Sequence, residues 1–222
     1  FSGVANITGQ SFGGLMASGL LNVVGEHMNG LQIAGIANIT ASKLNGVQVA
    51  LCNYATKARG LQIGLVNYYK EDMKGFQLGL VNANPDTKVQ MMVYGGNATP
   101  ANIGVRFKNQ LFYTILGVGS MYQGLNDKFS ASASYRAGLS FPLYKGLSIS
   151  GDLGYQHIEA FDNKDEVIPK RLYALQARAN LEYQFTKKFG IFATGGYGVT
   201  RFYNKSSNYD KGAIIEAGIV LF

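Results

Sequence analysis

The sequence has few charged residues, one cysteine and no long apolar run. Charged residues make up 15% of the 222 positions, against about a quarter in typical soluble domains. The single cysteine, Cys52, excludes an internal disulfide framework and makes a cysteine-rich metal site implausible, and we expect it to fill a strand position as a small apolar residue. Because no run approaches the roughly 18 apolar residues of a membrane helix, a helical membrane protein is excluded. A β-barrel is not, since its strands alternate over about ten residues.

The chain also lacks an initiator methionine and a charged-then-apolar leader, so we expect either a removed secretory signal or a late start. The opening SGVANIT resembles AGIANIT at residues 34–40, which favours missing upstream sequence. The formal charge is +7, but the basic residues are spread singly across turns. We therefore expect no nucleic-acid binding, which needs basic residues gathered on one face.

A short phrase recurs through the first 84 residues. GLQIGLVN at residues 60–67 is followed by GFQLGLVN at residues 75–82, and upstream relatives begin at Gly14, Gly30 and Gly46. Within the copy at residues 60–67 the residues alternate between two faces, Leu61, Ile63 and Leu65 against Gln62, Gly64 and Val66. Each copy therefore predicts one strand, and the closing Asn and following Gly predict a turn. A stacked β-solenoid with the Leu/Ile face in a narrow core and a row of antiparallel strands both fit this pattern.

From about Lys88 the repeat fades and the alternation becomes longer. FSASASYRAGLSF (129–141), GLSISGDLGY (146–155) and YALQARANLEYQF (173–185) each set an apolar face against a polar one, over enough residues to cross a bilayer. The connections between these segments alternate long and short, as outer-membrane barrels do. The sequence therefore predicts an integral membrane barrel rather than a soluble β-protein.

The expected fold is an all-β, antiparallel transmembrane barrel of about 14 strands that forms a single domain over residues 1–222. Residues 1–84 would form a repeat-built wall and residues 88–222 a wall of longer strands. The alternative is an 8-strand barrel with an N-terminal β-solenoid. We favour the 14-strand barrel because Gln62, Gly64, Gln77 and Gly79 form a face too small and polar for a second core but suited to a lumen. The expected strands are 1–6, 14–22, 30–38, 46–53, 60–67, 75–82, 88–95, 101–107, 110–121, 129–141, 146–157, 171–185, 188–201 and 211–222.

The recurring phrase over residues 14–82 resembles the surface-repeat proteins of Gram-negative outer membranes. The C-terminal AGIVLF, which ends on Phe222, is similar to the terminal-strand signal that the barrel-assembly machinery recognises. It departs from that signal because strict alternation places Glu216 on the same face as Phe222. A bulge would remove this conflict, as would a lipid face made of Ala213, Ile215, Ala217 and Ile219. The resemblance implies an outer-membrane location and says little about mechanism.

No residue pattern predicts catalysis, a cofactor or a metal. His27 and His157 lie in unrelated segments without metal-ligand spacing, and no hydrolase or phosphate-loop motif is present. Ser150, Asp152 and His157 come nearest to a triad, but His157 faces away from the other two on an unbroken strand. The loop EAFDNKDEVIPK contains four carboxylates without the spacing of a calcium loop, and we expect it to be solvated: Glu159, Asp162, Asp165 and Glu166.

Charged residues within the strands suggest a lumen network. Arg106, Arg136, Asp152, Arg178 and Glu182 all fall on the predicted polar face. If residues 143–145 turn a hairpin, Arg136 lies across from Asp152 as an ion pair. The network either fills and rigidifies the barrel or forms a charged constriction that selects solutes. Aromatic residues near strand ends predict interfacial girdles rather than a sugar-stacking platform: Tyr68, Tyr69, Phe141, Tyr144, Phe185, Phe189, Phe202 and Tyr203.

The predicted function is that of a non-catalytic outer-membrane barrel with a structural, accessory or partner-binding role, within a larger outer-membrane complex. The alternative is a small passive pore with a charged lumen. Expected partners are outer-membrane lipid, the barrel-assembly machinery during insertion and another outer-membrane protein.

Overall fold

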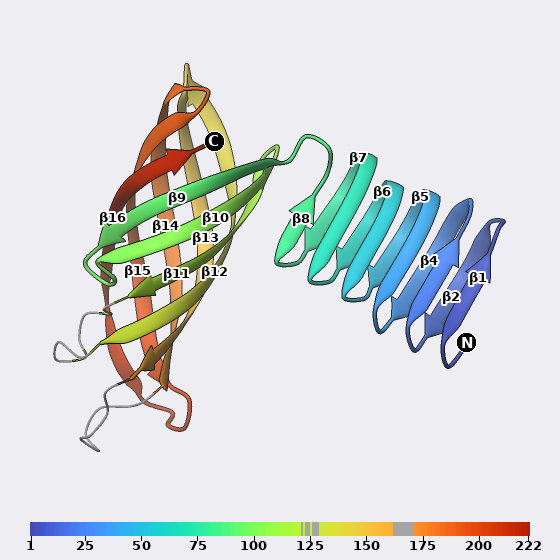
Figure 1. Cartoon of the computed structure of the whole chain (residues 1–222), viewed down its shortest axis with the longest axis horizontal. Helices are drawn as coiled ribbons and strands as arrows, with labels where there is room; N and C mark the ends of the chain where they lie inside the picture. The colour runs from blue at the N-terminus through green and yellow to red at the C-terminus, as the bar shows by residue number, and fades with distance from the viewer. Residues whose placement is uncertain (121, 123–124, 126–128, 162–170) are drawn as a thin grey trace. The chain divides into compact units, whose positions relative to one another are not determined.

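The computed structural model describes residues 1–120, 122, 125, 129–161 and 171–222. These residues form 16 β-strands (Figure 1). The described residues contain no helix long and apolar enough to cross a membrane. The chain divides into two compact units, Phe1–Thr87 and Lys88–Phe222.

The first unit is a parallel β-structure built from the repeats, shown in blue to teal in Figure 1. One row of paired strands runs β1–β3–β5–β6–β7–β8, and β2 and β4 extend a second row that joins at β5. The strand bounds are β1 (Ala5–Thr8), β2 (Phe12–Ser18), β3 (Leu21–Val24), β4 (His27–Ala34), β5 (Ala37–Val49), β6 (Cys52–Ile63), β7 (Val66–Leu78) and β8 (Val81–Ala83).

Equivalent residues of successive repeats lie directly beside one another in this unit. Gly46 pairs with Gly60 and Gln48 with Gln62, and the next strand continues the same register. Each repeat is therefore one coil, and the chain bends between coil sides at residues 50–51 and 64–65. Because of these bends, one copy of the phrase straddles two strands, so the expected single strand at 60–67 is wrong.

The polar face of the repeat points inward and is satisfied by ladders of side-chain amides. Gln62 Nε2 donates to Gln48 Oε1 at 2.9 Å, and Gln77 Nε2 donates to Gln62 Oε1 at 2.8 Å. A parallel ladder joins the asparagines, with Asn53 Nδ2 donating to Asn67 Oδ1 at 2.9 Å. Buried amides are costly without partners, and in-register stacking supplies one at every step. The small polar face that argued against a second core is thus part of the core, together with an apolar cluster of Met16, Val24, Met28, Leu44, Ala55 and Ala58.

Glycine at the head of each copy is required by close approach of the coils. Gly46 has a φ of 141°, and a Cβ there would lie 1.9 Å from the carbonyl oxygen of Gly30. Gly60 repeats this arrangement against Gly46, at 2.0 Å. Only glycine combines positive φ with this approach, which explains why the phrase always begins with it.

The second unit is a closed eight-strand antiparallel barrel in the order β9 to β16, and β16 pairs with β9. Its strands are β9 (Lys88–Gly96), β10 (Ala101–Asn109), β11 (Phe112–Ser120), β12 (Ser130–Tyr144), β13 (Leu147–Ala160), β14 (Arg171–Thr186), β15 (Phe189–Phe202) and β16 (Asn208–Leu221). The 14-strand barrel over residues 1–222 is therefore wrong, and the alternative of an 8-strand barrel with a solenoid-like N-terminal region is confirmed. The repeats stack in parallel because identical coils place matching Gln, Asn and Gly side by side, which antiparallel pairing of successive copies would separate.

The barrel wall is apolar outside and mostly polar inside. On β14, Leu175 and Leu181 are exposed on the outer face, whereas Gln176, Arg178 and Glu182 are buried. On β16, Ile215 and Ala217 face outward and Glu216 inward, which is the second resolution proposed for the C-terminal strand. A polar interior with an apolar outer surface is the arrangement of a membrane-spanning barrel.

Short connections join the strands at one end of the barrel and longer ones at the other. Residues 110–111, 145–146 and 187–188 make the short turns, and residues 121–129 and 161–170 fall in the long connections. Strand β9 begins at the short-turn end and β16 ends there, as the antiparallel order requires.

Aromatic side chains gather on the outside near both ends. Phe185 stacks on Phe189 near the short turns, at a centroid distance of 5.9 Å, and Tyr203 contacts Tyr173 near the long connections, at 5.0 Å. Three of the predicted girdle residues lie elsewhere: Tyr68 and Tyr69 belong to the repeat unit, and Phe202 packs against a cluster inside the barrel.

Candidate functional site

The barrel lumen gathers all five charged residues predicted for the polar face, together with Glu216. Three arginines, Arg106, Arg136 and Arg178, face three carboxylates, so the formal charges balance. All six side chains are buried. Burial of ions is viable only with close partners and further hydrogen bonds. The lumen supplies both for these groups, except that Nε and Nη1 of Arg178 have no hydrogen-bond partner among the described residues.

Arg106 and Glu182 connect opposite walls of the barrel. Arg106 lies on β10 and Glu182 on β14, four strands apart in a ring of eight. The guanidinium donates from Nη1 to Oε2 at 2.6 Å and from Nη2 to Oε1 at 3.0 Å, which is a bidentate pair. Its Nε donates to Gln90 Oε1 at 2.6 Å. The lumen is therefore crossed by side chains at this level.

Arg136 organises the middle of the lumen. It donates to both carboxylate oxygens of Asp152, at 2.9 and 2.8 Å, to Asn180 Oδ1 at 3.1 Å and to Glu216 Oε2 at 3.4 Å. Glu216 lies on β16, opposite β12, so this contact also spans the barrel. Asp152 additionally accepts from the Tyr113 hydroxyl at 2.8 Å.

The predicted register of the Arg136–Asp152 pair is wrong by two residues. Arg136 lies across from Gly154, and Asp152 lies across from Gly138 on one side and Arg178 on the other. The turn is at residues 145–146 rather than 143–145, and a register shift falls between Pro142 and Tyr144. The pair forms diagonally, because an arginine side chain is long enough to reach two positions along the neighbouring strand.

Arg178 completes the layer. Its Nη2 donates to Gln176 Oε1 at 2.7 Å and to Glu216 Oε1 at 3.2 Å. Glu216 therefore accepts from two arginines, Arg136 and Arg178. The lumen network predicted from the sequence does not include Glu216, although a lipid face that contains Ile215 and Ala217 leaves Glu216 facing inward.

Two apolar clusters occupy other parts of the lumen. At the end with long connections the cluster consists of Tyr122, Leu125, Ile158, Ala160, Leu172 and Ala174. Beside the Arg106–Glu182 pair lies a second cluster, made of Met92, Tyr94, Tyr113, Ile115, Phe192 and Val220. Apolar packing around an ion pair excludes water and strengthens the charge–charge interaction.

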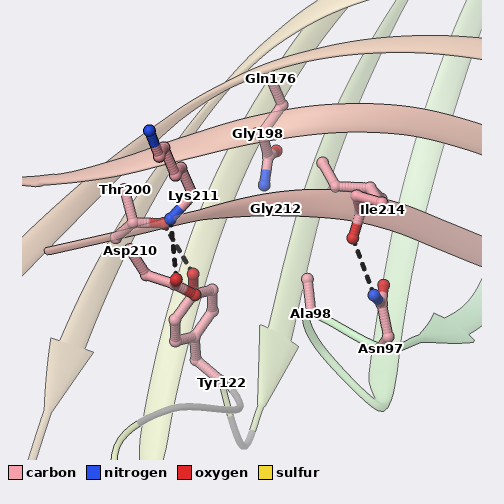
Figure 2. A pocket seen from close by; sticks show the side chains of 11 residues that line it. Asn97, Ala98, Tyr122, Gln176, Gly198, Thr200, Asp210, Lys211, Gly212 and Ile214 are labelled. Carbon is pink, nitrogen blue, oxygen red and sulfur yellow. Dashed lines mark hydrogen bonds between the residues drawn. The ribbon is translucent and has the colours of Figure 1, made fainter. Parts of the chain in front are cut away.

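Two cavities open at the ends of the lumen and are separated by the ion pairs. The cavity near the long connections has a volume of about 230 Å³ and is lined by residues that include Tyr122, Gln176, Thr200 and Lys211 (Figure 2). The cavity at the short-turn end has a volume of about 830 Å³ and is lined by Lys88, Lys108 and Glu182 among others. On β14, Arg178 and Asn180 lie between Gln176 and Glu182, so the charged layer divides the two cavities.

Phe222 lies at the short-turn end and points to the lumen side. Its ring packs against the cluster beside Val220, and its amide donates to Lys188 O at 3.1 Å. The structure thus keeps Phe222 and Glu216 on one face, and the role of Phe222 in assembly stays a prediction.

The residues considered for catalysis do not converge among the residues that the structure describes. Ser150 and Asp152 face the lumen, whereas His157 lies on the outer face and contacts the Tyr203 hydroxyl at 2.7 Å. No group of three metal-binding side chains occurs in the described part of the chain. Of the four loop carboxylates, Glu159 pairs with Arg171 at 2.9 Å, and Asp162, Asp165 and Glu166 lie outside the described residues.

Tyr203, which follows β15, has a perturbed hydroxyl. Desolvation, together with a hydrogen bond and charge repulsion from Tyr155, raises its pKa to about 12. The hydroxyl therefore stays neutral over the physiological range, as expected for a residue in an interfacial girdle.

Comparisons with known proteins find similar solved structures but no family. No protein-family model matches the chain, and no curated protein matches it. The resemblance to surface-repeat proteins therefore stays a prediction.

Solved structures that match include a de novo designed transmembrane β-barrel, at 13% identity over 60% of this chain and 91% of that chain, with a TM-score of 0.38. Neisserial surface protein A matches at 9% identity over 60% of this chain and 93% of that chain, with a TM-score of 0.38. The Yersinia pestis outer membrane protein Ail matches at 15% identity over 61% of this chain and 99% of that chain, with a TM-score of 0.38.

Proposed function

We propose that residues 88–222 form an outer-membrane barrel that is closed to solutes and anchors the repeat unit at the membrane. In this proposal the protein is non-catalytic and has a structural or partner-binding role within a larger outer-membrane complex. The repeat unit offers the surface for a partner, which we expect to be another outer-membrane protein.

The observation that carries this proposal is the pair of contacts across the barrel. Arg106–Glu182 and Arg136–Glu216 each join strands on opposite walls. A solute would have to separate buried ion pairs to pass, and leaving buried charges without partners is expensive, on the order of 3–5 kcal/mol for each broken pair. A selective pore must let the solute enter and leave easily, and a lumen closed by buried ion pairs does not.

The membrane location is supported by the outer surface and the connections. Exposed apolar residues such as Leu153, Leu181 and Ile215 cover the wall, with aromatic side chains near both ends. Barrels of this kind place short turns in the periplasm and long loops outside. Since β9 begins at the short-turn end, the chain preceding it would leave the membrane on the periplasmic side.

A non-catalytic role is supported by the positions of Ser150 and Asp152. Both accept hydrogen bonds from Asn180 in the lumen, and both lie on the other side of the wall from His157.

Insertion would depend on the barrel-assembly machinery. Phe222→Ala should lower the yield of heat-modifiable protein if that residue belongs to the recognition signal. Normal assembly of this variant would contradict that role.

Conductance in planar bilayers tests the closed barrel. The purified protein should give no stable channels. The double variant Arg106→Ala/Glu182→Ala removes both members of a pair, leaves no unpartnered charge and should raise leak currents. As a matched control, Glu159→Gln and Arg171→Gln alter an exposed pair outside the lumen and should leave the protein silent.

The alternative of a passive pore makes the opposite prediction. Stable ion-selective conductance of the unmodified protein, with a selectivity that changes in Arg136→Gln or Arg178→Gln, would overturn the closed barrel. Co-purification with a second outer-membrane protein, lost on deletion of residues 1–87, would support the partner-binding role. Extraction by alkaline or salt washing without detergent would contradict the membrane location itself.

A further inference from the structure

The outside of the repeat unit carries a continuous apolar edge. The bend row consists of Leu20, Ile36, Leu51, Leu65 and Leu80, stacked coil upon coil, and all five are 38% to 51% exposed. The outward residues on either side of each bend are also apolar, as with Ile63 before and Val66 after Leu65. We call these three rows the apolar edge. It consists of the bend row, the row before it (Ala17, Ile33, Val49, Ile63 and Leu78) and the row after it (Leu21, Ala37, Cys52, Val66 and Val81).

Polarity increases with distance from this edge on both sides of the coil. On β6 the outward residues leading away from the bend are Ile63 and Leu61, then Arg59 and Lys57. On β7 they are Val66 and Tyr68, followed by Lys70 and Glu71. All nine charged residues of Phe1–Thr87 lie outside the apolar edge.

This order of side chains matches the polarity profile of a lipid leaflet. Apolar side chains favour the acyl region, tyrosine favours the headgroup boundary, and lysine and arginine favour the aqueous side. Tyr68 stacks on Tyr54 of the preceding coil, at a centroid distance of 5.8 Å and an angle of 9°, which places a pair of aromatic rings at that boundary. The equivalent residues of the other coils are Val23, Ile39 and Ala83.

We propose that the apolar edge lies in the surface of a lipid bilayer, with the bend row immersed and the Tyr54–Tyr68 pair at the headgroups. From Leu65 to Tyr68 is three residues, or about 10 Å of strand, and interfacial elements insert their apolar face by about 5–10 Å. The dimensions of the edge therefore fit shallow insertion and not a crossing of the membrane.

The chain also restricts which surface is available. Four residues, 84–87, connect β8 to β9, and four extended residues span at most about 14 Å. If the barrel spans a membrane, this short connection keeps the end of β8 close to that membrane. The inference therefore rests on the membrane location of the barrel in the proposed function, and it adds lipid as the ligand of the repeat unit.

A protein partner fits the edge less well than lipid does. Protein interfaces carry about one hydrogen bond per 100–200 Å² and rely on aromatic or arginine anchors set in pockets. The side chains of the three rows are uniform aliphatic ridges, interrupted only by the thiol of Cys52, and none carries a hydroxyl, amide or charge. Such a surface is suited to a fluid apolar medium, which needs no shape complementarity.

Cys52 gives a probe on the edge without any substitution, because it is exposed and is the only cysteine. A nitroxide attached to Cys52 of the full-length protein in liposomes should collide readily with oxygen, which dissolves in lipid. Its collision rate with a water-soluble nickel chelate should be several-fold lower than that of a label at position 57. The latter is placed by Lys57→Cys in a Cys52→Ser background, on a side chain that is 55% exposed at the far bend.

Two outcomes would overturn the inference. Equal nickel accessibility at positions 52 and 57 would place the edge in water. Shielding of the Cys52 label from both reagents would show that protein covers it, whether a second copy or another chain. A second variant, Leu65→Glu beside the labelled Cys52, should restore nickel accessibility if lipid is the partner, and an unchanged rate would count against it.

Heat-modifiable migration of the same labelled samples separates the two hypotheses. If the barrel is heat-modifiable but the Cys52 label is in water, the lipid contact of the apolar edge is contradicted and the membrane barrel is not. If the whole chain fails to associate with membranes, the proposed function itself is contradicted.

Discussion

Arg106 and Glu182 hold each other across the full width of the barrel, from β10 to β14. Gln90 accepts a hydrogen bond from Nε of Arg106, so the buried guanidinium is fixed in orientation by two neighbours. The pair ties two walls that are not neighbours in the sheet, which strand pairing alone cannot do.

Removing one partner of this pair should destabilise the barrel more than removing both. Glu182→Gln leaves a buried arginine without its carboxylate and should lower the free energy of unfolding by about 3–5 kcal/mol, whereas Arg106→Met/Glu182→Leu should cost much less. Urea titrations of the protein in lipid vesicles measure both. A double variant that lost as much stability as the two single changes added together would show that the pair contributes no coupling. Glu159→Gln, in an exposed pair, should have no measurable effect.

A charge on the lipid face should be costly at mid-height. Leu153 is 71% exposed and lies near the middle of β13. Leu153→Arg should lower the free energy of unfolding in vesicles by about 2–4 kcal/mol, since the bilayer centre cannot solvate the guanidinium. Leu153→Ala keeps the face apolar and serves as the control. If the arginine variant were as stable as the alanine variant, this face would not be in lipid.

The barrel strands could be predicted from the sequence because each carries its own alternation. The inward sets of β13 and β14 follow directly from period two, and so does the lumen position of the five charged residues. Contacts between distant strands could not be predicted in this way. Nothing local indicates that Arg106 reaches Glu182, because that pairing depends on the number of strands in the ring.

The repeat region was mispredicted for a physical reason. A polar face of Gln and Asn indicates a lumen only if those amides need water, and parallel stacking gives each amide a partner in the next coil instead. The 14- to 16-residue spacing of similar phrases also fits in-register coils. The bend at residues 64–65, inside the phrase, was hidden because Gly64 and Leu65 also continue the alternation.

The barrel should fold without the repeats. A fragment of residues 88–222 retains every strand of the closed ring, and β9 pairs with β10 and β16 on its two sides. The fragment should therefore refold in detergent and show the heat-modifiable migration that is also expected of the full chain. Failure to assemble would indicate that the repeat unit completes the barrel edge, because unpaired strands in lipid have no partners for their backbone groups.

The two faces of the repeat should respond oppositely to arginine. Gln62 is fully buried and bonds to Gln48 and Gln77, so Gln62→Arg should break both amide contacts, bury an unpartnered charge and destabilise the repeat unit by more than about 3 kcal/mol. Leu65 is 49% exposed at the bend, so Leu65→Arg should leave the coil folded.

Limited proteolysis of the full chain in detergent measures the difference. The Gln62→Arg protein should be trimmed rapidly to a resistant fragment that begins near residue 88, because the barrel is a separate unit. The Leu65→Arg protein should be cut as slowly as the unmodified chain. A face assignment with leucine inside would reverse the two results, with Leu65→Arg trimmed and Gln62→Arg resistant, and that outcome would contradict the amide core.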